Sequence, residues 1–250
     1  MKKVSLILTT YNSGENVRKT LESIEKQDYP NIEVVIKDGG STDHTIEIIK
    51  QYQKQSKNHV IWKSQKDTGI YDAMNQGYEM SSGDVVAFFN DVFVTDDVIT
   101  KLIKKIEEIN PDTEKEYIGV HADLVYADGE TVIRKWKMGQ GTIYQGWMPG
   151  HPTLFLKREI YEKYGVYDSC YKIAADYEFM IRFLKDKENQ LAYLPETVIS
   201  MFYGGTSSGG LKSYFVSLME SHKALVKNKI PFAWWLVFRR GLRVLWQFKR

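Results

Sequence analysis

Side chains able to bind a cation or hydrogen-bond to a polar ligand follow four apolar segments early in the chain, at the point where each segment ends. These polar runs are Thr9–Asn12, Asp38–Asp43, Asp67–Gly69 and Asn90–Asp91. Their carboxylate, amide and hydroxyl oxygens are the groups that hard divalent cations prefer. Each run alone is also compatible with a turn or a helix cap, because Asp, Asn, Ser and Gly favour both. The four together predict a site for a polar ligand.

The four apolar segments have the length and composition of β-strands. They are Val4–Leu8, Ile32–Ile36, Val60–Trp62 and Asp84–Phe89. Between them apolar residues recur every three or four positions, as Val17, Leu21 and Ile24 do, which predicts helices. Strands that alternate with helices predict an α/β fold with a mostly parallel, Rossmann-like sheet flanked by helices. Ligands bind such a sheet beyond the carboxyl ends of its strands, where the polar runs fall.

The second half of the chain is less regular. Its apolar patterns predict strands over 117–126, 131–137, 153–156 and 191–203, and helices over 158–164 and 175–185. The glycine-rich segments 139–150 and 204–210 are expected to be loops. From residue 211 onward the chain is expected to be helical, with a break at Pro231.

The composition and the missing motifs exclude several classes of protein. An apolar fraction of 43% is too high for a disordered chain, and the single cysteine, Cys170, excludes a disulfide scaffold and suits a reducing compartment. No Gly-x-Gly-x-x-Gly follows the first strand and no P-loop sequence is present, which argues against those two phosphate-binding sites. Acidic residues facing a phosphate ligand require a divalent cation between them, Mg²⁺ or Mn²⁺.

Five sets of motifs, in order along the chain, resemble glycosyltransferase family 2, whose members have the GT-A fold. The resemblance covers about residues 3–205, and its motifs are Val4–Asn12, Val34–Asp43, Asp67–Gly77, Gly83–Asp91, and Gly150–Pro152 with Ala174–Glu178. It implies a catalytic domain over 1–210, with a nucleotide half at about 1–95 and an acceptor half at about 96–210. It also implies a metal-dependent, inverting hexosyl- or N-acetylhexosaminyltransferase that moves a sugar from a uridine diphosphate (UDP) sugar to an acceptor hydroxyl.

The resemblance also implies roles for individual residues. Asp38 would accept a hydrogen bond from the uracil N3–H, Asp91 would hold the cation, and Asp176 would be the general base. The other positions implied at the nucleotide sugar are Thr9, Tyr11, Asp67, Gly69, Asn75 and Asn90. Positions implied on the acceptor or donor side are His151, Glu178 and Trp147.

The motifs depart from the family pattern at the metal site. The sequence Phe89-Asn90-Asp91-Val92-Phe93 lacks the second carboxylate of the usual Asp-x-Asp. Asp91 would then bind the cation together with the diphosphate and water, while Asp96 and Asp97 are expected to cap the next helix. Glu178 stays open as a rival base to Asp176, and His151 and Trp147 are equally compatible with core packing.

The segment 211–250 is expected to be a basic amphipathic helical tail. The net charge of +2 hides an asymmetry, because residues 221–250 hold eight Lys and Arg and no Asp or Glu, which leaves 26 basic and 32 acidic residues in the rest. On a helical wheel centred on Phe238, Trp234, Trp235 and Trp246 share one side and most arginines the other. Such a helix is typical of binding to a membrane surface. The alternatives are docking on the acidic body or on a second subunit.

The tail and the resemblance together predict a peripheral protein at the cytoplasmic, inner face of the cell membrane. They favour a lipid-linked acceptor, as in bacterial surface polysaccharide assembly (O-antigen, lipopolysaccharide or capsule), and possible homo-oligomers. A nucleic-acid partner is not expected, because large apolar residues interrupt the basic ones. Two other functions stay open: a sugar-nucleotide pyrophosphorylase, and a non-catalytic sugar-nucleotide-binding or membrane scaffold protein with a degenerate metal site.

Overall fold

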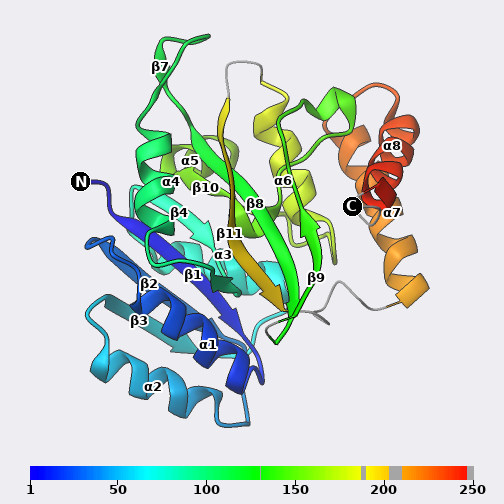
Figure 1. Ribbon diagram of the computed structural model, residues 1–250. Coiled ribbons are helices and arrows are strands. Elements are labelled where there is room, and N and C mark those ends of the chain that lie inside the picture. The colour runs from blue at the N-terminus through cyan, green and yellow to red at the C-terminus, as the bar shows by residue number, and fades with distance from the viewer. Residues whose placement is uncertain (130, 187–189, 203–209, 247–250) are drawn as a thin grey trace.

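A central parallel sheet forms the first half of the protein. The computed structural model describes the chain except for residues 130, 187–189, 203–209 and 247–250 (Figure 1). Its parallel strands lie in the order β3-β2-β1-β4 and span His59–Ser64, Ile32–Asp38, Val4–Thr10 and Val85–Phe88. In β1, Leu6 and Leu8 contact one apolar cluster and Ile7 contacts the other, as the two-residue period of a strand requires. The sheet is therefore buried on both faces, as the alternating pattern predicts.

The second half extends the same sheet with mixed strands. Strand β10 (Phe155–Lys157) pairs antiparallel with both β4 and β8 (Gly119–Asp128), and β8 pairs parallel with β11 (Leu191–Phe202). Strand β5 (Val92–Phe93) pairs antiparallel with β11 and ends the sheet. Strand β9 (Thr131–Trp136) pairs antiparallel with β8. Strands β6 (Ile109–Asn110) and β7 (Lys115–Glu116) form a separate hairpin.

Helices cover both faces of the sheet. On one face lie α1 (Gly14–Glu25), α2 (Thr45–Gln55) and α4 (Val98–Ile106). On the other lie α3 (Ile70–Met80), α5 (Arg158–Tyr164) and α6 (Ala175–Leu184). Helices α7 (Gly210–Lys227) and α8 (Ala233–Trp246) pack beyond α6 at one side of the molecule (Figure 1).

Most elements agree with the sequence-based expectations, within a few residues at their ends. The short strand β5 and the β6–β7 hairpin were not foreseen, because two-residue strands carry no periodic pattern. The strand expected at 153–156 begins later, at Phe155, because a 3₁₀ turn, η2 (His151–Thr153), precedes it. The loop expected at 204–210 lies outside the described residues, apart from its last residue, which opens α7.

The structure divides the C-terminal segment into two helices, and α8 lies on the body through one side. Ala233, Leu236 and Val237 are buried, whereas Trp234 and Phe238 are more than half exposed. At about 100° per residue the buried and exposed positions lie on opposite sides of the helix. The arginine side does not simply face solvent, since the Arg240 guanidinium lies 4.2 Å from the centre of the Tyr177 ring. Among the described residues, no helix is both long and apolar enough to cross a membrane.

Candidate active site

A cavity of about 550 Å³ opens at the carboxyl ends of β1 and β4, where ligand binding is expected in a parallel sheet. Six of the residues singled out in the sequence line it: Thr9, Tyr11, Asp67, Gly69, Asn90 and Asp91. Met201 and Phe202, at the end of β11, close the other side. These two were not foreseen, because the pairing that brings β11 to this edge joins distant parts of the chain. We call this the donor cavity, after the nucleotide-sugar donor that the sequence motifs predict there.

A pair of hydrogen bonds fixes the wall of the donor cavity between β1 and β4. The Asn90 side chain accepts a hydrogen bond from the Thr9 backbone amide at 3.0 Å and donates one to the Thr9 hydroxyl, also at 3.0 Å. Asn90 therefore joins the ends of two neighbouring strands, which places the following carboxylate, Asp91, in the cavity.

Asp38 lies behind the donor cavity and does not line it. Its buried carboxylate accepts five hydrogen bonds, from the backbone amides of Gly40 and Ser41 and from the hydroxyls of Thr10, Ser41 and Ser64. Burial alone would raise the pKa of Asp38, but these hydrogen bonds hold it below its ordinary value. A direct bond to a uracil N3–H would have to displace one of these donors. The geometry instead gives Asp38 the role of shaping the loop beside the cavity.

Lys37 is a buried cation beneath the donor cavity that sequence reasoning missed. Its ammonium donates to the carbonyl of Gln65 at 2.6 Å and of Asp38 at 2.9 Å, and lies 3.3 Å from the Asp67 carboxylate. Lys37 thus orients Asp67 toward the cavity. A lysine directly after the apolar run Val34–Ile36 of a buried strand was the signal that could have found it, since buried lysines are almost always paired.

Asp91 is the buried carboxylate of the donor cavity. It is 9% exposed, and among the described residues it accepts one hydrogen bond, from the Phe202 backbone amide at 3.4 Å. Burial raises the pKa of Asp91 to about 6, which the Phe202 amide only partly offsets. A carboxylate so poorly compensated favours a bound cation. Asp97 takes the N-cap position of α4, as expected, but its side chain makes no capping hydrogen bond and contacts Thr95 and Lys101 instead.

Asp176 stands at the start of α6, and a tyrosine from the donor side reaches it. The Tyr71 hydroxyl lies 2.5 Å from the Ile173 carbonyl and 3.1 Å from Oδ1 of Asp176. Burial and the Asp176 charge both raise the pKa of Tyr71, so the hydroxyl keeps its proton at neutral pH. Tyr71 belongs to α3, whose first residue, Ile70, lines the donor cavity. Helix α3 therefore connects the donor cavity to Asp176.

His151 and Asn75 meet at Tyr167 rather than in the donor cavity. The His151 Nε2 lies 2.8 Å from the Tyr167 hydroxyl, and the imidazole stacks on Phe88. Burial lowers the pKa of His151, although the Asp176 charge opposes this. The Asn75 side chain hydrogen-bonds to both the amide and the carbonyl of Tyr167, at 3.0 and 2.8 Å. Asn75 is therefore a clamp between α3 and the acceptor half, and not a residue of the donor cavity.

Glu178 and Trp147 are engaged in packing. Glu178 is fully buried, with its carboxylate 2.8 Å from Arg182 and 3.1 Å from both Lys227 and Asn228. These partners join α6 to α7, which removes Glu178 as a rival to Asp176. Trp147 is 6% exposed, and its indole donates to the Met138 carbonyl at 3.1 Å.

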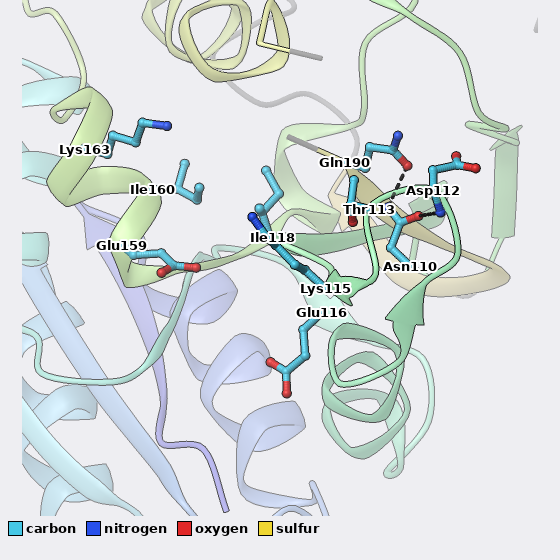
Figure 2. A pocket seen from close by; sticks show the side chains of 10 residues that line it. All are labelled: Asn110, Asp112, Thr113, Lys115, Glu116, Ile118, Glu159, Ile160, Lys163 and Gln190. Atoms are coloured by element: carbon cyan, nitrogen blue, oxygen red, sulfur yellow. Dashed lines mark hydrogen bonds between the residues drawn. The ribbon is translucent and has the colours of Figure 1, made fainter. Parts of the chain in front are cut away.

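A second cavity, of about 610 Å³, lies at the opposite edge of the sheet. Figure 2 shows its lining side chains, which come from the β6–β7 hairpin, from α5 and from Gln190 before β11. Glu116, at its rim, pairs with Lys2 and Lys157. This edge holds the amino ends of the parallel strands, where α/β proteins do not bind their ligands. Although it is the larger of the two, we do not assign this cavity to donor binding.

The sheet has the strand arrangement of the GT-A fold, with a polar cavity at the carboxyl ends of its strands and the Asp176 carboxylate nearby. These features agree with the glycosyltransferase class of protein. The model of glycosyl transferase family 2 matches residues 5–174, and the chain belongs to this family. A PGL/p-HBAD biosynthesis glycosyltransferase of Mycobacterium bovis is 27% identical over 82% of this chain and 78% of its own. A glycosyltransferase of Mycobacterium tuberculosis is 30% identical over 72% of this chain and 68% of its own.

Solved structures show the same fold. Residues 1–349 of Staphylococcus aureus TarS, in complex with UDP-GlcNAc, superpose with a TM-score of 0.69 at 20% identity, over 89% of this chain and 66% of that chain. Mannosyltransferase PcManGT from Pyrobaculum calidifontis, in complex with GDP-Man and Mn²⁺, gives 0.67 at 16% identity, over 98% and 74%. These two structures hold different nucleotides on one fold, so the likeness does not decide which base this chain binds.

Proposed function

We propose that this glycosyltransferase takes its sugar from a UDP-sugar in the donor cavity and transfers it, with inversion, to an acceptor hydroxyl. The observation that carries this proposal is the connection between the donor cavity and Asp176 through α3 and Tyr71. The choice of uridine follows the family resemblance of the sequence motifs, and TarS in complex with UDP-GlcNAc is an example of a UDP-sugar bound to this fold. The same complex supports a hexosyl or N-acetylhexosaminyl unit as the sugar transferred.

Asp176 is proposed as the general base. It would take the proton of the acceptor hydroxyl while that oxygen attacks the anomeric carbon and the diphosphate leaves from the opposite side, which inverts the anomeric centre. Asp176 stands in the first turn of helix α6. Tyr71 contacts one carboxylate oxygen of Asp176, and the other would take the proton of the acceptor hydroxyl.

Asp91 fits a divalent cation as a single protein ligand. The described part of the chain contains no group of three or more His, Cys, Asp and Glu placed to hold a metal. Oxygens of the diphosphate and water would therefore complete the coordination, as Mg²⁺ in particular prefers. When bound, Mn²⁺ or Mg²⁺ would neutralise the charge that develops on the leaving diphosphate. Asp91 supplies the buried negative charge that favours such an ion.

The exposed face of α7 and α8 is proposed to lie on the inner surface of the cell membrane. The large apolar side chains exposed on these helices and the turn between them are Phe215, Met219, Val226, Phe232, Trp234, Trp235 and Phe238. Exposed aromatic residues beside Lys and Arg suit an anionic lipid surface. Membrane binding supports a lipid-linked acceptor in surface polysaccharide synthesis. A second subunit covering the same face is the other outcome to be tested.

A thermal-shift screen tests the donor. UDP-, GDP- and TDP-sugars are compared with and without Mn²⁺, since a ligand that binds only the folded state raises Tm in proportion to its occupancy. A Tm increase that needs both a UDP-sugar and Mn²⁺ is expected. A preference for GDP-sugars would overturn the uridine assignment. Binding without any UDP release in the presence of acceptor would favour a non-catalytic protein.

A further inference from the structure

The histidine of β8, His121, is buried without a partner. Its side chain is fully buried, and neither ring nitrogen has a hydrogen-bond partner among the residues that the structure describes. The ring is held in place by Tyr193, which stacks on it at 5.0 Å, and by Trp147, whose ring lies edge-on at 5.2 Å. Burial lowers the pKa of His121 to about 3, so the imidazole is neutral and offers one donor and one acceptor. Buried polar groups left without partners are uncommon and call for an explanation.

His121 lines a cavity of about 350 Å³ beneath the 140–147 loop. Its lining combines aromatic and apolar groups with neutral polar ones and one carboxylate: His121, Gln140, Thr142, Ile143, Tyr144 and Trp147, with Asp186 and Leu191 opposite. None of the described lining residues is Lys or Arg. The volume is at the small end of the range for ligand pockets. The described lining fits a neutral molecule that has both apolar and hydroxyl-bearing faces.

We propose that this cavity is a subsite for a neutral pyranose ring of the acceptor saccharide, whose hydroxyls pair with the His121 nitrogens after the side chains that cover them have moved aside. A pyranose presents C–H groups on one face, which pack on aromatic rings, and hydroxyls at its edge, which satisfy a donor and an acceptor at once. Tyr144, which is 44% exposed, stands at the mouth. The identification of the ring as part of the acceptor rests on the proposed function.

The cavity lies away from the reacting hydroxyl. Asp176 is at the start of α6, whereas Leu184, at its end, lines the cavity. These eight residues of helix span about 12 Å along the axis. The ring bound at His121 would therefore be a distal sugar of the acceptor and would contribute to acceptor selection.

Saturation-transfer NMR with methyl glycosides tests the proposal. The probes are the methyl glycosides of glucose, galactose, mannose, rhamnose, N-acetylglucosamine and N-acetylgalactosamine, added to the full chain with saturating UDP and Mn²⁺. At least one should receive saturation from the wild-type protein. His121→Phe, which keeps a ring of similar size and removes two unpaired nitrogens, should fold and lower that signal at least fivefold. His59→Phe, at an exposed histidine on β3, is the matched control and should leave it unchanged.

Three results would overturn the proposal. They are no saturation of any glycoside, an unchanged signal in His121→Phe, and displacement of the glycoside by a UDP-sugar, which would assign the ring to the donor. Gln140→Ala, at an exposed position of the rim, gives a second variant that does not depend on the core and should also weaken binding. The experiment measures glycoside binding and not sugar transfer. A wrong donor assignment would therefore leave its result unchanged, and a failure of this experiment would leave the donor assignment unchanged.

Discussion

The hydroxyl of Tyr71, on α3, lies 3.1 Å from Oδ1 of Asp176, on α6. Tyr71 is a positioning residue in this arrangement. Tyr71→Phe should lower kcat about tenfold and leave the KM for the donor nearly unchanged, because the carboxylate loses its orientation but keeps its chemistry. Steady-state kinetics measure both constants. Tyr78→Phe, on the same helix but distant from Asp176, is the control, and an equal loss in both variants would contradict the assignment.

Asp176→Asn should abolish the general base and leave the donor cavity intact. The expected loss of transfer is on the order of 10²–10⁴-fold, the usual contribution of a positioned base. The Tm increase caused by UDP-sugar and Mn²⁺ should be retained, because Asp176 does not line the donor cavity. Turnover close to that of the wild type would remove Asp176 from this role.

Asp91→Asn should stabilise the ligand-free protein at neutral pH. The folded-state pKa of about 6 lies above the ordinary value of 3.8, so the folded form favours the protonated carboxyl. The raised pKa stabilises the folded state fully below pH 4, and this stabilisation is lost as the pH rises through 6. It amounts to at most about 3 kcal/mol for a pKa difference of about two units. Chemical denaturation at pH 4.5 and 7.5 should show the variant gaining only at the higher pH. The same variant should lose its Mn²⁺-dependent donor binding.

The exposed Asp96 supplies the matched control for that experiment. Asp96→Asn should change the free energy of unfolding little at either pH and should keep Mn²⁺-dependent binding. A wild-type protein whose donor binding and activity are unaffected by a chelator would contradict the cation at Asp91.

Asp38→Asn should act through the fold rather than through a lost contact with the base. The amide group of Asn cannot accept all five hydrogen bonds, so we expect a loss of about 1–3 kcal/mol in the free energy of unfolding without ligand. Because the pKa of Asp38 is lowered by folding, the wild-type advantage should be present above pH 4 and disappear as the pH falls below it. Asp112→Asn, at an exposed carboxylate, is the control. If Asp38→Asn leaves the free energy of unfolding unchanged but weakens UDP binding, the result would instead support a direct contact between Asp38 and uracil.

Replacing Trp234 and Trp235 together by Ser should weaken binding to anionic liposomes at least tenfold, because both side chains are more than half exposed on the outer side of α8. Liposome flotation measures the binding. Val132→Ser with Ile133→Ser, on exposed β9, is the matched control and should bind as the wild type does.

Loss of a dimer in analytical ultracentrifugation, with no change in liposome binding, would instead assign this face of α8 to a second subunit. Truncation at Asn228 is a poorer test, because it also removes the buried Leu236 and Val237.

Several residues that line the donor cavity could be predicted from sequence because they follow the strands of the parallel sheet. Thr9, Asp67 and Asn90 needed only the rule that ligands bind beyond the carboxyl ends of parallel strands. The family resemblance added roles, and Asp38 shows their limit, since only the structure reveals how many donors surround its carboxylate.

The remaining site residues depend on long-range packing, which the sequence pattern does not express. Tyr71 was placed correctly on a helix, but its contact with Asp176 joins positions 105 residues apart. His121 lies within an expected strand, and no periodicity marks it as the buried member that lines a cavity. The helical wheel showed that α8 is amphipathic, but only the contact of Arg240 with Tyr177 shows which side is turned inward.

Gly146 joins two parts of the protein that have been described separately. It adopts a positive φ of 65° at the end of the 3₁₀ turn η1 (Ile143–Gln145), and a Cβ there would come within 3.3 Å of the Leu236 carbonyl oxygen of α8. The loop over the His121 cavity therefore rests directly on the helix whose far side carries the exposed tryptophans. If that side lies in the lipid headgroups, the 140–147 loop is held at a fixed height above the bilayer. The protein would then measure acceptors by the distance between their lipid and their sugars, as well as by the sugars themselves.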